Sequence, residues 1–174
     1  MQFPPVSEPC REVPLVPSAA PVPPPLASDL AVFGSALRAG GLRSALLFLN
    51  GRTPHRFTGV FRFDGDMLRS VHLVDKWDPL VERGDDVPLA SAYCAHLQRT
   101  GEPLDLADGR DDPRLPWMAE SEVVSYCGAA ITAPDGTPWG ALCHFDTSRA
   151  ESKDSDLPLL VAAAAQLYER VAGC

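Results

Sequence analysis

A tight turn between two strand-forming runs constrains the fold of this chain more than any other feature. Residues 125–146 place these runs on either side of Pro-Asp-Gly-Thr, and the glycine supplies the positive φ angle that a hairpin turn needs. With a two-residue turn at Asp135-Gly136, antiparallel pairing sets Cys127 opposite His144. Cys127 and His144 then share one face of the sheet, and Cys143 projects from the other face.

The remaining segments alternate between helical and strand periodicity. We predict first a helix from Ser28 that breaks at Gly40-Gly41 and resumes to Leu49, and then strands at 58–64 and 67–75 with one face exposed to water. The predicted elements that follow are a helix at 89–99, a strand at 103–107, a surface loop at 108–116 and a final helix at 155–171. A second tight turn, Gly65-Asp66, joins the strands at 58–64 and 67–75.

Proline dominates the N-terminal segment, where half of the 18 prolines precede Leu26. Because proline lacks a backbone donor and fixes φ, we predict that residues 1–27 form an extended tail. Such a tail serves as a linker or as a strap across the domain surface, and a polyproline II docking segment is the alternative. Residues 28–174 are then predicted to form a single domain of ordinary size.

Charge and hydropathy restrict the partners of the chain. A net charge of −8 at pH 7 opposes binding to nucleic acid and to anionic lipid. We find no uninterrupted apolar run near the roughly 20 residues of a membrane helix, and residues 1–27 lack the pattern of a secretion signal. We therefore expect no membrane partner and a cytoplasmic location. The five cysteines are odd in number and widely spaced, so we expect free thiols rather than a disulfide framework.

The order of the predicted elements, together with five short motifs, resembles a GAF domain, the small-molecule sensing module of many signalling proteins. The motifs are GVFRFD (59–64), AYCAH (92–96), TGEPL (100–104), DGRDDP (108–113) and GTPWGALCHFD (136–146). The resemblance implies an α+β fold of the profilin-like, PAS-related kind. Its central antiparallel sheet would have about six strands, with the N- and C-terminal helices on one face and pocket loops and short helices on the other.

The resemblance also suggests where a ligand would bind. In segments that wall a GAF cavity, this sequence has aromatic residues beside polar ones, which suits a ligand with a flat or apolar body. Asp108 and Arg110 would fix an anionic or zwitterionic group, and a solvated loop with paired charges is the alternative. The predicted ligand-binding residues are Trp77, Tyr93, Asp108, Arg110, Trp117, Tyr126 and His144, although a structural role is the alternative for the histidine.

We predict neither a metal nor a covalent cofactor. Cys94 with His96, and Cys143 with His144, lack the spacing of a structural zinc site. Cys94 is followed by Ala95, whereas bilin-attaching GAF domains have histidine after their cysteine. The expected ligand is therefore a small molecule of unknown identity.

These expectations favour a stand-alone sensory or regulatory module of bacterial type over an enzyme. Output would pass through the terminal helices, to a second copy of the chain or to a separate signalling protein. The apolar stripe of the last helix, Ala162–Ala165 with Leu159 and Leu167, either forms a dimer face or packs on the sheet.

Two other functions stay open. One is a thiol-dependent reductase of the free methionine sulfoxide reductase type, with Cys127 or Cys94 as nucleophile and Asp108 or Asp146 assisting proton transfer. The cysteines do not reproduce the spacing of that family, and small hydrophobic packing is the alternative role for Cys127 and Cys143. The other function is a ligand-free module for protein contacts.

Overall fold

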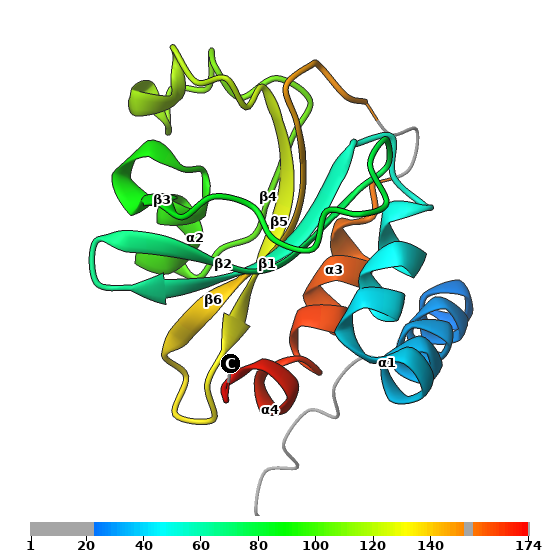
Figure 1. Ribbon diagram of the computed structural model, residues 1–174. Coiled ribbons are helices and arrows are strands. Elements are labelled where there is room, and N and C mark those ends of the chain that lie inside the picture. The colour runs from blue at the N-terminus through cyan, green and yellow to red at the C-terminus, as the bar shows by residue number, and fades with distance from the viewer. Residues whose placement is uncertain (1–22, 152–154, 174) are drawn as a thin grey trace, which may run out of the picture.

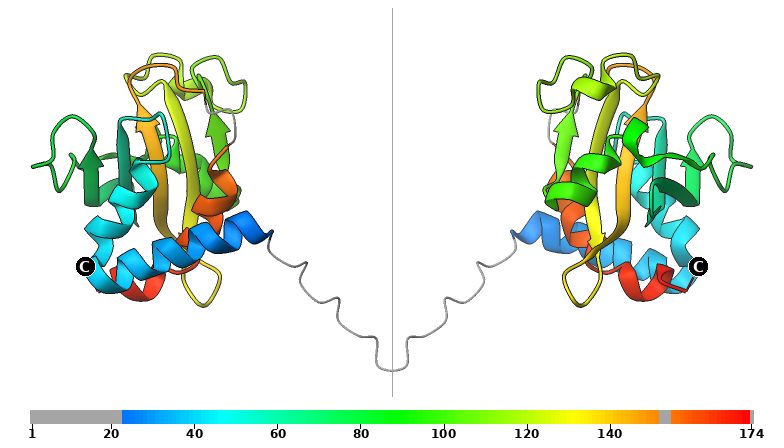
Figure 2. Two further views of the ribbon diagram at one scale, coloured as in Figure 1. Left: turned by 90° about the vertical axis from the view of Figure 1, so that its right-hand side faces the viewer. Right: turned by 90° about the vertical axis from the view of Figure 1, so that its left-hand side faces the viewer.

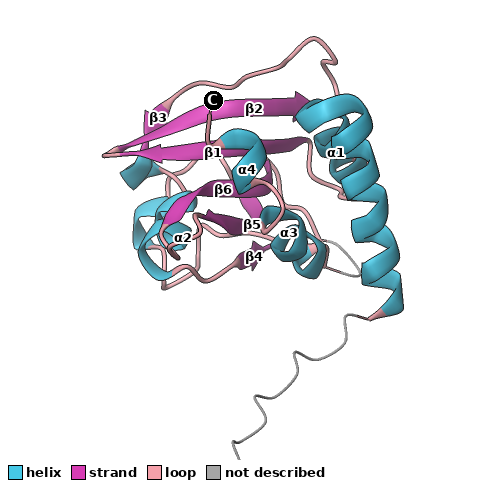
Figure 3. Cartoon of the chain, turned by 90° about the horizontal axis from the view of Figure 1, so that it is seen from below, coloured by secondary structure: helices cyan, strands magenta, loops and turns pink. Residues whose placement is uncertain are grey.

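The computed structural model describes residues 23–151 and 155–173 and shows six strands in one antiparallel sheet (Figure 1). The elements in chain order are α1 Pro24–Asn50, β1 Phe57–Asp64, β2 Met67–Asp75, β3 Val87–Pro88, a 3₁₀ helix Leu89–Ser91, α2 Cys94–Thr100, β4 Leu104–Leu106, a 3₁₀ helix Pro116–Met118, β5 Ser125–Thr132, β6 Pro138–Asp146, α3 Leu157–Ala164 and α4 Tyr168–Val171. The strands lie in the order β3-β2-β1-β6-β5-β4, which Figure 3 shows from below. The predicted α+β fold with an antiparallel sheet is confirmed.

Both faces of the sheet are covered. Helices α1, α3 and α4 lie on one side, α2 and the loop before β5 lie on the other, and the loop before β3 runs along the β2 edge (Figures 1 and 2). Alternate residues of β1 enter the two resulting cores, so that Val60 packs with the terminal helices and Phe61 with the α2 side. The prediction of one wet face is therefore wrong for β1, because the terminal helices cover Val60 on the face that alternation assigned to water.

Helix α1 consists of two segments that meet at Gly41. Its φ of +71° with ψ of −168° is a conformation open almost only to glycine, and the chain turns sharply there (Figure 2). The turn brings Asp29 of the first segment to an ion pair with Arg52, which follows the second, at 2.9 Å. The predicted break at Gly40-Gly41 is thus confirmed.

The start of α1 differs from the prediction. The helix begins at Pro24 rather than Ser28, because proline is tolerated in the first helical turn, where its missing N–H has no intrahelical partner. The last part of the predicted extended tail is therefore helical, and residues 1–22 lie outside the described residues.

By length and composition alone, α1 is also apolar enough to cross a membrane, as Pro25–Asn50. Scattered polar residues divide this segment, so it contains no uninterrupted apolar run of that length. In the fold, Phe33, Leu46 and Leu49 of this helix are buried in the core beneath the sheet. A core helix of a folded domain passes the same test of composition.

The hairpin of β5 and β6 has the predicted register but a different turn. The Gly136 N–H donates to the Ala133 carbonyl, so the loop has three residues, Pro134–Gly136, instead of two. A bulge at Trp139 of β6 then shifts the pairing by one residue and restores Cys127 opposite His144. The two irregularities cancel, and the assignment of faces is confirmed.

Two further helical predictions also change. The segment predicted as one helix at 89–99 is a 3₁₀ turn and α2, separated by the extended Ala92. The final helix is interrupted between α3 and α4. Its stripe is buried against the sheet and α1, with Leu159, Ala163 and Leu167 in the core. The stripe therefore packs on the sheet, as one of its two predicted roles requires, and its role as a dimer face stays a prediction.

Candidate functional site

A cavity of about 340 Å³ lies between the sheet and the α2 side of the molecule. Strands β1, β2, β5 and β6 supply its floor, and the segments 84–94 and 118–123 supply its walls. Five of its lining side chains are aromatic, namely Phe57, Phe61, Tyr93, Tyr126 and Phe145. Phe145 stacks on Phe57 with ring centroids 5.0 Å apart, so these rings form one continuous apolar surface.

The polar groups of the cavity occupy two separate places. Tyr126, Cys94 and Cys143 are buried at its inner end. Asp85 and Ser91 are exposed to solvent and mark its mouth. The side chains between these two places are aliphatic or aromatic. Small-molecule sites are commonly lined in this way, with a few polar groups that orient an otherwise apolar ligand.

The three inner polar groups lie close to one another. The Cys94 sulfur lies 3.1 Å from the Tyr126 hydroxyl, and Cys143 lines the same cavity from β6. The neighbouring Cys143 lowers the pKa of Cys94 against the opposing effect of burial. Burial raises the pKa of Cys143 and of Tyr126 well above their ordinary values. At neutral pH the tyrosine is therefore a neutral hydrogen-bonding group.

Two glycines, which lack a Cβ atom, leave the space that the two tyrosine rings occupy. A Cβ atom on Gly128 would lie 2.4 Å from the Tyr126 hydroxyl oxygen, and one on Gly109 would lie 2.5 Å from the Tyr93 ring. The two rings stack at 5.2 Å. The Tyr93 hydroxyl donates to the backbone carbonyl of Val123 at 3.2 Å, and burial raises its pKa to about 12. These contacts hold one wall of the cavity in place.

Of the predicted ligand-binding residues, Tyr93 and Tyr126 line this cavity, and the others lie elsewhere. Trp77 is 75% exposed and stacks under the Arg56 guanidinium at 4.1 Å. Trp117 is half-buried beneath Arg99, and its neighbour Met118 reaches the cavity instead. Sequence spacing placed these rings near the cavity but did not show which way they point.

The predicted charged pair is satisfied within its own loop. Arg110 donates to both carboxylate oxygens of Asp108, at 3.0 and 2.7 Å. Hydrogen bonds from Arg110 lower the pKa of Asp108 to about 2. Asp112 and Arg114 form a second pair of the same kind. The alternative of a solvated loop with paired charges describes this segment.

His144 and Cys127 lie on the opposite face of the sheet, among the terminal helices. His144 is fully buried, its Nδ1 is 2.7 Å from the Thr58 hydroxyl, and its ring stacks on His55 at 5.9 Å. Burial lowers its pKa to about 3, so the imidazole is neutral. Burial also raises the pKa of Cys127 far above its ordinary value. As a predicted nucleophile, Cys127 is therefore both protonated and remote from the cavity.

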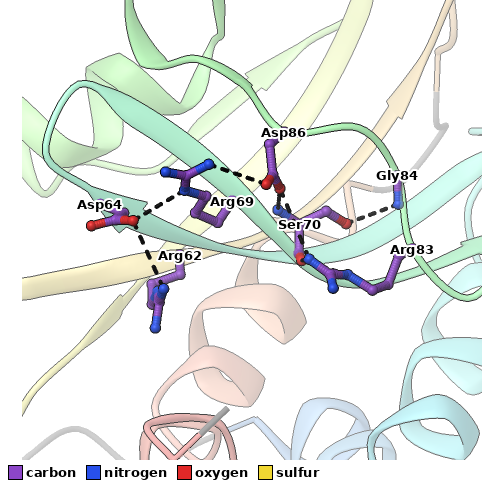
Figure 4. A network of polar contacts seen from close by, with 7 residues as sticks. All are labelled: Arg62, Asp64, Arg69, Ser70, Arg83, Gly84 and Asp86. Carbon is purple, nitrogen blue, oxygen red and sulfur yellow. Dashed lines mark hydrogen bonds and ion pairs between the residues drawn. The ribbon is translucent and has the colours of Figure 1, made fainter.

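A second hollow, at the edge of β1 and β2, is lined by charged residues (Figure 4). Arg62 and Arg69 face each other across the strand pair, which by itself is unfavourable. Asp64 lies between them, at 3.9 and 3.0 Å, and Asp86 accepts a further hydrogen bond from Arg69 at 3.3 Å. Arg83 also lines the hollow, 4.0 Å from Asp86, so the two aspartates compensate most but not all of the charge of three arginines.

Sequence reasoning missed most of the cavity. The predicted register places Cys143 on the face away from His144, and Phe145, Phe57 and Phe61 could have been assigned by the same alternation. No such signal exists for Asp85 and the rest of the 84–94 segment, whose position depends on tertiary packing. Among the described residues, no group of three or more His, Cys, Asp or Glu side chains is placed to hold a metal ion.

Comparison with solved structures identifies several similar folds. The GAF domain of a phosphoenolpyruvate-protein phosphotransferase from Acinetobacter is 12% identical, with a TM-score of 0.67 over 87% of this chain and 95% of that chain. Free methionine-R-sulfoxide reductase from Neisseria meningitidis, solved with its substrate, is 18% identical, with a TM-score of 0.60 over 84% and 86%. A far-red-absorbing protein with bound biliverdin IXa is 17% identical, with a TM-score of 0.61 over 82% and 97%.

At these identities the similarities establish the fold alone. A comparison with curated proteins gave no significant match. The model of the GAF domain family matches residues 34–170, which span α1 to α4 and include every strand of the sheet. This chain therefore belongs to the GAF domain family.

Proposed function

We propose that this GAF domain binds a small, predominantly apolar molecule in the cavity beside Tyr126 and serves as a sensory or regulatory module. The cavity of about 340 Å³, with its five aromatic side chains, is the observation that carries this proposal. Its volume lies within the range of about 300–1,000 Å³ that is usual for small-molecule sites. Two similar folds support it, since one was solved with its substrate and another with biliverdin.

The arrangement of polar groups narrows the class of ligand. Tyr126 offers a hydroxyl at the inner end, which suits one polar atom on an otherwise apolar body. Asp85 is the one charged residue that lines the cavity within the described part of the chain, and it lies at the mouth. An anionic ligand would meet this carboxylate and the net charge of −8. We therefore propose a neutral or cationic ligand.

Strand β5 provides a direct route for output. Its residue Tyr126 faces the cavity, while the next residue, Cys127, packs in the core of the terminal helices. A ligand that displaces the tyrosine would shift β5, and with it the packing of α3. We propose that a second copy of the chain or a separate cytoplasmic signalling protein receives this change.

A thermal-shift screen with a matched pair of variants tests the proposal. The screen compares neutral, cationic and anionic metabolites, and a ligand that binds the folded state raises the melting temperature. Ala92→Phe places a ring in the cavity, whereas Ala90→Phe places one on the neighbouring exposed surface. We expect neutral or cationic hits that Ala92→Phe loses and Ala90→Phe retains. A screen without hits, or hits that survive Ala92→Phe, would contradict the proposal.

The reductase alternative retains one of its candidate nucleophiles. Cys94 lines the cavity, whereas Cys127 faces the helices and Asp108 is held by Arg110. Turnover of free methionine sulfoxide with a thiol reductant is the relevant assay. Activity that Cys94→Ser removes and Cys127→Ser leaves intact would establish this function in place of sensing alone.

A further inference from the structure

The inner end of the cavity brings together two thiols from distant parts of the chain. Cys94 begins α2 and Cys143 lies in the middle of β6, yet α2 packs against β6 and both side chains line the same cavity. The described fold has a third free thiol, Cys127, on the opposite face of the sheet. Cys94 and Cys143 therefore lie on one side of the sheet, and the sheet separates them from Cys127.

The pair is buried but can be reached through the cavity. Cys94 and Cys143 are 3% and 1% exposed, yet both belong to the lining of a cavity whose mouth includes the exposed residues Asp85 and Ser91. A space of about 340 Å³ is far larger than the roughly 30 Å³ that one water occupies in the liquid, so a molecule the size of hydrogen peroxide can enter. Buried thiols without such access are inert.

The contacts distinguish the two thiols chemically. The neighbouring Cys143 and the Tyr126 hydroxyl lower the pKa of Cys94, and the hydroxyl oxygen lies 3.1 Å from the Cys94 sulfur. A lowered pKa favours the thiolate form that attacks peroxides. Cys143 has its own pKa raised by burial and is the less reactive partner until Cys94 has been oxidised. This asymmetry is the one that an attacking and a resolving cysteine require.

We propose that Cys94 and Cys143 are a peroxide-sensitive dithiol, which a small hydroperoxide entering the cavity converts to a disulfide between α2 and β6. This site goes beyond the proposed function and does not depend on the identity of any ligand. Closure would tie the wall at α2 to the floor at β6, and would replace two thiols at the inner end of the cavity with an apolar disulfide.

The reaction is balanced for hydrogen peroxide. The Cys94 sulfur attacks one peroxide oxygen, the O–O bond breaks, and the thiol proton leaves with the released oxygen as water. The resulting sulfenic acid is attacked by the Cys143 sulfur, the S–O bond breaks, and a second water carries away the Cys143 proton. Two thiols are oxidised by two electrons in total and one peroxide is reduced. An added dithiol reverses the change by thiol–disulfide exchange.

Peptide mapping of the full chain tests this proposal. The native protein is treated with hydrogen peroxide, its remaining thiols are alkylated, and the digest is analysed by mass spectrometry without reduction. We expect a Cys94–Cys143 linked peptide that dithiothreitol removes, in the wild type and equally in Cys127→Ser, which is the matched control. No such link should form in Cys143→Ser, where dimedone should instead label Cys94 as sulfenic acid.

Two results would overturn the proposal. One is a wild-type map in which Cys94 and Cys143 remain as alkylated thiols while Cys10 or Cys174 reacts. The other is a link that includes Cys127, which the sheet separates from the pair. Because the wild-type map decides by itself, a variant that fails to fold leaves the test intact. Failure here is also distinct from failure of the metabolite screen, which uses reduced protein.

Discussion

Tyr126 and His144 show what the side-chain alternation of a strand pair implies for single residues. Both are predicted to bind ligand, yet the predicted register sets Cys127 opposite His144, so Tyr126 must point to the other face. The structure places the tyrosine in the cavity and the histidine in the helical core. The register therefore separates the two residues, although it does not tell which face holds the cavity.

The buried state of His144 predicts a dependence of stability on pH. Its folded pKa of about 3 lies below the ordinary value of 6.5, so the unfolded chain binds the proton more readily between these values. The contribution to stability is thus present above pH 6.5 and is lost as the pH falls toward 3. From pH 7.5 to 5.0 we expect this residue to lower the unfolding free energy by about 2 kcal/mol.

Urea denaturation at the two pH values measures this effect. His144→Asn keeps an acceptor for the Thr58 hydroxyl but cannot titrate, so its stability should change less with pH than that of the wild type. His72→Asn, at a half-buried position, is the control and should flatten the profile less. Equal pH profiles for the wild type and His144→Asn would show that the imidazole is not held neutral by the fold.

At the scale of elements, glycines with positive φ decide how α1 and the hairpins turn. The reversals at Gly41, Gly65 and Gly136 are all predicted from glycine in a suitable context, and each has a positive φ in the structure. Loop length is less predictable. The Asp135-Gly136 hairpin has three loop residues and a compensating bulge, because a type I turn followed by a left-handed glycine competes with the two-residue turn.

The reversal of α1 leads to a prediction at this scale. Gly41→Ala forces a side chain into a conformation that costs about 1–3 kcal/mol, so the midpoint of urea unfolding should fall. Gly51→Ala is the matched control, since Gly51 ends the same helix with a φ of −65° and space for a Cβ. Its stability should be unchanged or slightly raised. Equal losses in the two variants would contradict a special role for Gly41.

At the scale of the whole molecule, the domain begins earlier than the sequence suggests. Prolines at 24 and 25 lead to the prediction of an extended tail as far as residue 27, but they occupy the first turn of α1. Leu26 in that turn is partly buried against the core of the terminal helices. The boundary therefore depends on a tertiary contact that proline content does not reveal.

Two shortened chains test this boundary. A chain that starts at Ser28 loses the first turn of α1 and the contact of Leu26, whereas a chain that starts at residue 23 keeps both. We expect the shorter chain to be less stable by about 1 kcal/mol, which is part of the value for burying a leucine side chain. Melting temperatures and urea midpoints measure the difference, and equal values would support the boundary at Ser28.

The order of elements, the antiparallel register and the family can be predicted from the sequence, because they depend on short-range periodicity, turn glycines and local motifs. Strand alternation alone was enough to assign Cys143 and Cys127 to opposite faces of the sheet. The folded structure is needed to learn which face is hollow, that Trp77 is exposed to solvent, and that Cys94 and Cys143 line the same cavity. Those facts depend on how α2 and the loops pack over the sheet, and contacts between segments far apart in the sequence leave no periodic pattern in a single chain.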